Sequence, residues 1–207
     1  VLTTISLFAQ KQVESKLFDT GKMWTFNYPP VEYLNERYGF DPSNEWLQDV
    51  RLSALRFGNG CSASFVSGDG LIMTNHHCAE SVKRKVAKDG EDLVRNGFYA
   101  ETLELERKIP GLFVDQLIFM EDVTKEVQQA MDEGETDAEK IENKEDRIEE
   151  LIEEYEEETE LRCEFVSFFN GGKYSIYGYK RYDDIRLVFI PEEQIGYFGG
   201  DFDNYTY

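Results

Sequence analysis

A short hairpin bracketed by two cysteines places the strongest constraint on how this chain folds. Residues 62–67 and 71–74 are predicted strands, and the tight glycine-containing turn 68–70 joins them. Cys61 precedes the first strand and Cys78 follows the second, so the two cysteines come close together in space. A disulfide between them would stabilise the fold by about 3 kcal/mol on the chain-entropy estimate.

A histidine lies directly before the second of these cysteines. Histidine is the side chain best suited to moving protons near neutral pH. A disulfide at Cys78 would hold the preceding residue, His77, in a fixed place at the end of a strand. This arrangement is the one expected of a general base.

The rest of the chain predicts a mainly β domain with one helical insertion. Further predicted segments are a capped helix through Arg56, a short helix with a loop over 81–96, and strands at 112–120, 165–169, 174–179 and 185–190. Between 122 and 162 apolar residues recur with a period near 3.6, among them Ile141, Ile148, Leu151, Ile152 and Tyr155. We therefore expect a helical insertion at about 121–164.

The insertion also carries most of the negative charge. It has 20 acidic and 5 basic residues, against a net charge of −20 for the whole chain. Its glutamate-rich side is most simply a solvated helix face. A calcium site is the alternative, but alternating oxygen ligands around a central glycine are absent. The acidic balance argues against nucleic-acid partners and against docking on an anionic membrane.

Composition and the N-terminus indicate an exported globular protein. Hydrophobic residues make up 41% of the chain, enough for a packed core, and no apolar run is long enough to span a bilayer. Residues 1–10 resemble the end of a secretory signal peptide with Ala9 before the cleavage point, although a frayed or strand-forming terminus would also fit. An exported protein could pair two of the three cysteines, and the count alone does not say which two.

Several motifs together resemble the bacterial dipeptidyl-peptidases of the seven and eleven types. The sequence Thr-Asn-His-His-Cys at 74–78, after a Cys-Ser-Ala-Ser-Phe strand, resembles the His-Cys motif of chymotrypsin-like serine proteases, and the double histidine narrows the match. Further similar motifs lie at 21–26, 97–100, 108–111, 122–124 and, as Gly-Gly-Asp-x-Asp-Asn, 199–204. Each motif is weak alone, but the set covers nearly the whole chain in the family's order.

The resemblance implies the first half of a two-barrel serine peptidase. Residues 1–20 would be a signal-peptide remnant or N-terminal extension, and residues 21–207 the N-terminal part of the peptidase domain, a chymotrypsin-type β-barrel. The implied activity is release of dipeptides from the free N-termini of oligopeptides, at the cell surface or in the periplasm. The resemblance implies no cofactor and no metal, and it allows a homodimer.

The resemblance also implies roles for individual residues. His77 would be the general base, and Cys61 would bridge to Cys78. Asn204 would bind the substrate near its N-terminal amine, and Tyr205, where the family commonly has tryptophan, would wall a pocket. The aspartate and serine of the triad would lie beyond this chain, which we therefore expect to be inactive alone.

Three other interpretations compete with this one. Cys61, His76, His77 and Cys78 could supply two thiolates and two imidazoles to zinc, although successive strand residues point to opposite faces. The chain could instead be a non-catalytic peptide-binding module on a degraded protease fold. A cysteine peptidase is weaker, because Cys78 is next to His77 in sequence and an acidic helix before Cys163 would raise its pKa. We expect Cys163 to be a small buried residue and His76 a packed or hydrogen-bonded one.

Overall fold

The structure, a computed structural model, describes residues 24–197. The chain divides into two compact units, residues 1–49 and 50–207, which we describe separately. The expected boundary at residue 20 lies outside the described residues. None of the helices in the described part is both long enough and apolar enough to cross a membrane.

The first unit contains helix α1, Val31–Tyr38, and the start of helix α2, Asn44–Ser53. Aromatic rings pack against one another here, with Trp24 and Tyr33 5.7 Å apart between ring centroids. The backbone N–H of Trp46 donates to the Ser43 hydroxyl, so the predicted cap of α2 is confirmed. The helix ends three residues earlier than the predicted Arg56, because the chain enters a strand at Ala54.

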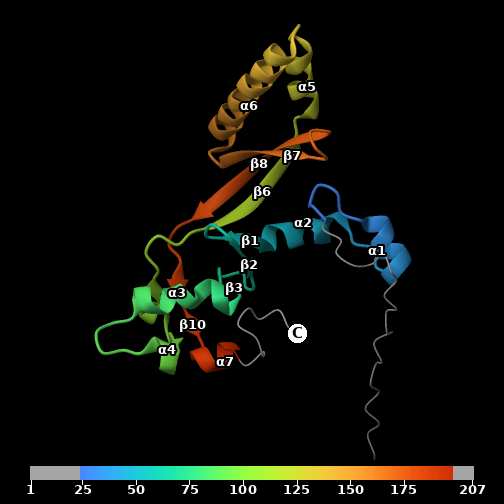
Figure 1. Cartoon of the computed structure of the whole chain (residues 1–207). Helices are drawn as coiled ribbons and strands as arrows, with labels where there is room; N and C mark the ends of the chain where they lie inside the picture. Colours follow the sequence, from blue (N-terminus) through green and yellow to red (C-terminus); the bar gives the residue numbers. More distant parts are fainter. Residues whose placement is uncertain (1–23, 198–207) are drawn as a thin grey trace, which may run out of the picture. The chain divides into compact units, whose positions relative to one another are not determined.

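The second unit is built on a six-stranded antiparallel sheet with strand order β3-β2-β1-β6-β8-β7 (Figure 1). The strands are β1 Ala54–Phe57, β2 Cys61–Phe65, β3 Ile72–Thr74, β6 Val114–Asp122, β7 Arg162–Phe168 and β8 Lys173–Tyr182. Two small antiparallel pairs join β4, Phe98–Tyr99, to β10, Phe189–Ile190, and β5, Arg107–Lys108, to β9, Arg186–Leu187. The predicted β-rich class is confirmed.

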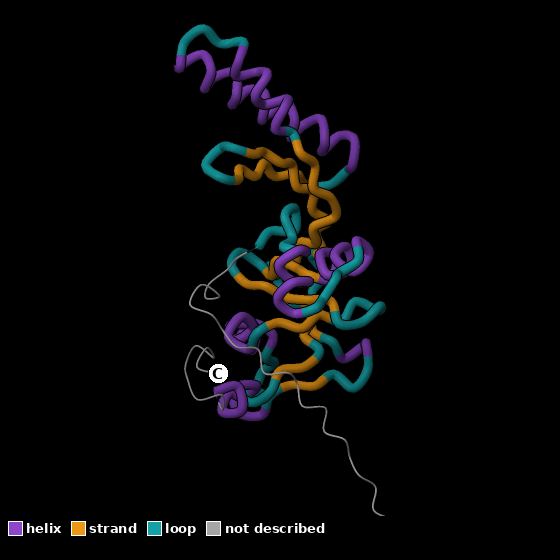
Figure 2. Tube along the Cα trace, turned by 90° about the vertical axis from the view of Figure 1, so that its right-hand side faces the viewer, coloured by secondary structure: helices purple, strands orange, loops and turns teal. Residues whose placement is uncertain are grey.

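The helical insertion is confirmed as a pair of helices between β6 and β7. Helix α5 spans Thr124–Asp132 and α6 spans Asp137–Thr159, and the two lie side by side against the end of the sheet formed by β7 and β8 (Figures 1 and 2). Their core contains Val123, Val127, Leu151, Cys163, Tyr174 and Ile176. The predicted apolar side is correct for Ile148 through Tyr155, but Ile141 near the start of α6 is 57% exposed.

Three short helices gather around a second core. They are α3 His76–Val86, α4 Leu93–Asn96 and α7 Glu193–Tyr197, and a single 3₁₀ turn lies at Leu103–Leu105. The buried residues of this core are Val82, Val86, Leu93, Ile109, Leu187 and Ile190. Helix α3 begins five residues before the predicted helix at 81, so it follows strand β3 almost directly.

Gly97 between α4 and β4 is a position where only glycine fits. Its φ is +64°, and an added Cβ would lie 2.6 Å from the carbonyl oxygen of Ile190. At Gly90 φ is +82° but an added Cβ would meet nothing within 4 Å. Left-handed backbone alone costs about 1–2 kcal/mol for other residues.

We therefore expect Gly97→Ala to lower the free energy of unfolding by clearly more than Gly90→Ala does. The control variant measures the cost of a positive φ without a clash, about 1–2 kcal/mol. The difference between the two variants adds the clash at Ile190 to the further backbone cost at Gly97, whose ψ of −166° is accessible essentially to glycine alone. Urea unfolding of the two variants gives the comparison. Equal losses would mean that the chain at Ile190 moves away at no cost.

Candidate active site

The predicted disulfide is present. Cys61 at the start of β2 is bonded to Cys78 in the first turn of α3, with the two Cα atoms 6.1 Å apart. Both cysteines pack against the core formed by Leu55, Phe57 and Val114. The bond therefore ties the start of α3 to the sheet.

His77 lies in the first turn of α3, and the prediction that it ends a strand is wrong. Asn75 is still extended, with φ −70° and ψ 146°, and its carbonyl oxygen accepts a hydrogen bond of 3.1 Å from the Cys78 N–H. The helix thus starts immediately after β3. His77 is half-buried, and one of its ring nitrogens lies within 4.8 Å of both disulfide sulfurs.

The helical start also changes the argument about zinc. Cys61, His77 and Cys78 bring their ligand atoms within 4.8 Å of one another, so the expected divergence is wrong for the neighbours His77 and Cys78, whereas His76 does not belong to this group. The two sulfurs are bonded to each other, however, and zinc is bound by thiolates. The Nε2 atom of His76, the fourth predicted ligand, is hydrogen-bonded to Lys83. The oxidised protein therefore does not present the four ligands as a set.

His76 is hydrogen-bonded, as predicted. Its Nε2 lies 3.2 Å from the Nζ atom of Lys83, which is further along α3. Burial lowers the pKa of His76 below 6.5, and the positive charge of Lys83 lowers it further. Neutral imidazole is the form that can accept this hydrogen bond.

Cys163 is free and buried in the core under the helical insertion, as predicted. Burial raises the pKa of its thiol, and the carboxylate of Glu156 adds to the effect. A raised pKa was predicted from the acidic helix, whereas the structure makes burial the larger cause and Glu156 the smaller one. A thiol of this kind is a poor nucleophile, which disfavours a cysteine peptidase.

The remaining predicted site residues lie outside the described part of the chain. They are Asn204 and Tyr205, together with the signal-like segment at the N-terminus. The last described element before Asn204 is α7.

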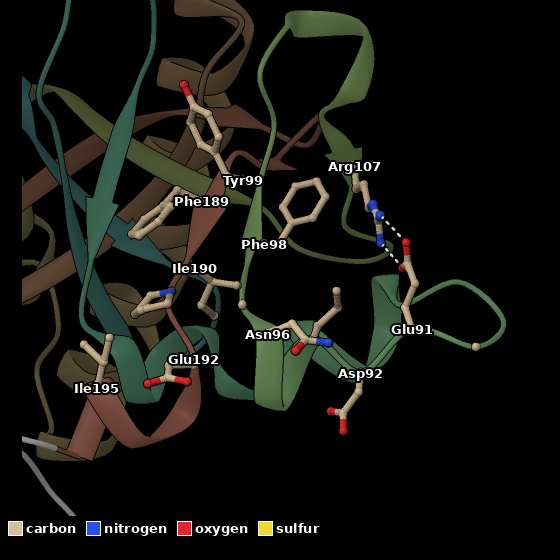
Figure 3. Close-up of a pocket in the computed structure, with 14 residues that line it drawn as sticks. Glu91, Asp92, Asn96, Phe98, Tyr99, Arg107, Phe189, Ile190, Glu192 and Ile195 are labelled. Carbon is tan, nitrogen blue, oxygen red and sulfur yellow. Dashed lines mark hydrogen bonds and ion pairs between the residues drawn. The ribbon is translucent and has the colours of Figure 1, made fainter.

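One hollow in the described part lies among α4, β4, β10 and α7 and measures about 690 Å³. Figure 3 shows the rings of Tyr99 and Phe189 on one side of β4 and the ring of Phe98 on the other side, toward Arg107. On the rim, Arg107 donates two hydrogen bonds of 2.6 and 2.8 Å to Glu91 and thereby lowers the pKa of that carboxyl to about 2. His77 does not line this hollow, so it is separate from the candidate base.

A second hollow of about 530 Å³ lies over β1, β6, β7 and β8 and is lined by paired charges. Asp115 is buried and accepts two hydrogen bonds of 2.7 Å from Arg181, and Arg56 binds Glu164 at 2.7 Å. Asp115 and Arg181 are directly opposite each other on the neighbouring strands β6 and β8, where opposite charges stabilise a sheet. His77 does not line this hollow either.

The comparisons with known proteins give the chain a family. The sequence pattern of the family described as peptidase S46 matches residues 18–207. The chain belongs to this family. Its S46 relatives include a dipeptidyl-peptidase 7 from Porphyromonas endodontalis, 33% identical over 87% of this chain, and an Asp/Glu-specific dipeptidyl-peptidase from Shewanella putrefaciens, 33% identical over 91%. The chain spans 22% and 26% of the lengths of these two S46 peptidases.

The fold of this S46 chain is also found in solved structures. The crystal structure of Porphyromonas endodontalis DPP11 in complex with the dipeptide Arg-Glu is similar with a TM-score of 0.68 and 25% identity. The likeness covers 88% of this chain and 28% of that one. The resemblance to the dipeptidyl-peptidases of the seven and eleven types is therefore confirmed.

Proposed function

We propose that this chain supplies the general base and the disulfide-bonded first β-barrel of a chymotrypsin-like serine dipeptidyl-peptidase. One observation carries the proposal: a disulfide anchors the turn that holds His77, in a chain whose S46 match covers 18–207. A base must be held in a fixed orientation to transfer a proton efficiently. The names of the relatives support dipeptide release as the reaction.

In this mechanism His77 accepts the proton of a serine hydroxyl as that oxygen attacks the peptide carbonyl, and it then returns the proton to the leaving amine. The serine and the orienting aspartate come from outside this chain. Asn204 would accept a hydrogen bond from the substrate's N-terminal ammonium, and Tyr205 would form a wall beside it. The dipeptide bound by DPP11 supports oligopeptides as substrates.

Export to the periplasm or cell surface is part of the proposal, and so is a possible homodimer. A disulfide between Cys61 and Cys78 supports an oxidising compartment, where such bonds form and persist.

The proposal is tested by comparing a free-amine peptide with its N-acetylated twin, using the complete enzyme. We expect a dipeptide to be released from the free-amine peptide only, because the acetyl group removes the ammonium charge that Asn204 would bind. Asn204→Ala should weaken cleavage of the free-amine peptide. Binding of the peptide without cleavage would instead favour the non-catalytic binding module, and equal cleavage of both peptides would rule out the exopeptidase.

A further inference from the structure

Lys83 is a fully buried lysine six residues after the candidate base on the same helix. Lys83 belongs to α3, where Val82 and Val86 are the other buried residues, and it is 1% exposed. Within residues 24–197 the ammonium makes one hydrogen bond, to Nε2 of His76 at 3.2 Å. Burying an ammonium that has three donors and a single partner is costly. Such a lysine is rarely retained for packing alone.

The hydrogen bond between Lys83 and His76 connects the first turn of α3 to the later turns, which contain its buried residues. Residues seven apart lie on the same face of a helix, so Lys83 reaches back along α3 to His76. Asn75, at the N-cap, makes no side-chain capping hydrogen bond. The first turn is held instead at His76 by Lys83 and at Cys78 by the disulfide. His77 is the residue between these two attachments.

We propose that Lys83 is a positioning residue for His77, acting through its hydrogen bond to His76. This inference rests on the proposed function, in which His77 is the base. The disulfide fixes Cys78 to strand β2, and the hydrogen bond fixes His76 to the buried Lys83 further along α3. Together they limit how far the backbone at His77 can rotate about the helix axis.

The chemistry of the two groups determines where the proton on His76 lies. An ammonium can only donate, so Nε2 of His76 accepts and its proton is on Nδ1. The charged and titratable groups that face His76 are Lys83 and Glu80 from α3, Glu193 from α7, and His77. Burial and Lys83 lower the pKa of His76 more than the two glutamates raise it. The hydrogen bond is therefore complete above pH about 6.5 and is lost as the pH falls through the lowered pKa.

Nitrogen NMR of the imidazole rings tests the contact without any enzyme assay. The chain has only two histidines, so His76→Gln assigns both sets of signals. We expect His76 to be the Nδ1–H tautomer with a pKa below that of an exposed histidine. Lys83→Met should raise this pKa and remove the tautomer preference. An Nε2–H tautomer, or signals that Lys83→Met leaves unchanged, would overturn the inference.

Kinetics of the complete enzyme test the positioning role. Lys83→Met should lower kcat by about tenfold to a hundredfold with KM unchanged, because a displaced base harms the transition state and not substrate binding. Rates are counted per serine titrated with a fluorophosphonate, which removes any effect of misfolded protein. Lys85→Met is the matched control, an exposed lysine on the same helix, and should leave kcat unchanged.

A second variant keeps the test decisive if Lys83→Met does not fold. His76→Leu removes the acceptor of the same contact at a half-buried position and should lower kcat similarly, and the double variant should lose no more than either single one. Additive losses, or a kcat unaffected by both variants, would remove Lys83 from the positioning of the base. Absence of peptidase activity in the wild type would instead refute the proposed function, and the NMR result would still decide the contact.

Discussion

His77→Ala is expected to lower kcat/KM for dipeptide release by at least about 10⁴-fold, the usual cost of removing a triad histidine. In the proposed mechanism the imidazole of His77 takes the serine proton, and an alanine side chain offers no acceptor for it. KM should change little, because the base contributes to the transition state more than to substrate binding. The measurement compares wild type and variant on a free-amine peptide at equal concentrations of folded protein.

The neighbouring histidine provides the control for this prediction. His76→Gln should cost far less than His77→Ala, because Lys83 already occupies its Nε2. Thermal unfolding of both variants should stay close to that of the wild type, since both side chains are only half-buried. A rate for His77→Ala equal to the wild-type rate would mean that His77 is structural. The binding module would then be the better account of this chain.

The parts of the fold that were predicted correctly carry strong local signals. Gly68-Asp69-Gly70 specifies the turn of the hairpin, and the strand predicted at 174–179 lies within β8, although six successive residues of β8 are buried and do not alternate. The α6 helix has a capping box at Thr136 and Glu139 and a clear apolar side. In each case nearby residues contain the information that determines the structure.

The elements that were missed depend on contacts between distant residues. Ala54–Phe57 continues a helical pattern, but it becomes β1 because Leu55 pairs with Ala63 on one side and Gln116 on the other. β4 and β5 have two residues each, too few to show a period, and the single strand predicted at 185–190 is divided into β9 and β10. Tertiary pairing overrides local propensity at these positions.

The candidate site was predicted in part for the same reason. The disulfide and His77 follow from the position of Cys61 and Cys78 around a hairpin. The contact between Lys83 and His76 was missed because α3 was expected to begin near residue 81, which hides their seven-residue spacing. The signal that could have revealed it is a lysine between Val82 and Val86, two apolar residues four apart on a short helix.

Loss of the disulfide should have the second large effect. Replacing both Cys61 and Cys78 with serine is expected to lower the free energy of unfolding by about 3 kcal/mol. Without the disulfide the unfolded chain has a higher conformational entropy, because the loop between the two residues is no longer closed. Urea unfolding of the oxidised chain and of the double variant measures the difference. A reducing agent should destabilise the wild type by a similar amount and leave the double variant unchanged, which separates the bond from any effect of the serines.

Thiol labelling of the unfolded chain checks the pairing that this prediction assumes. The oxidised chain should show one free thiol, that of Cys163, and the reduced chain three. Three free thiols in oxidised protein would contradict the disulfide. Because the bond also anchors the first turn of α3, its loss should lower kcat in the complete enzyme even under conditions where the protein stays folded. Unchanged kcat in the folded double variant would show that the Lys83 contact and the core under α3 suffice to hold His77.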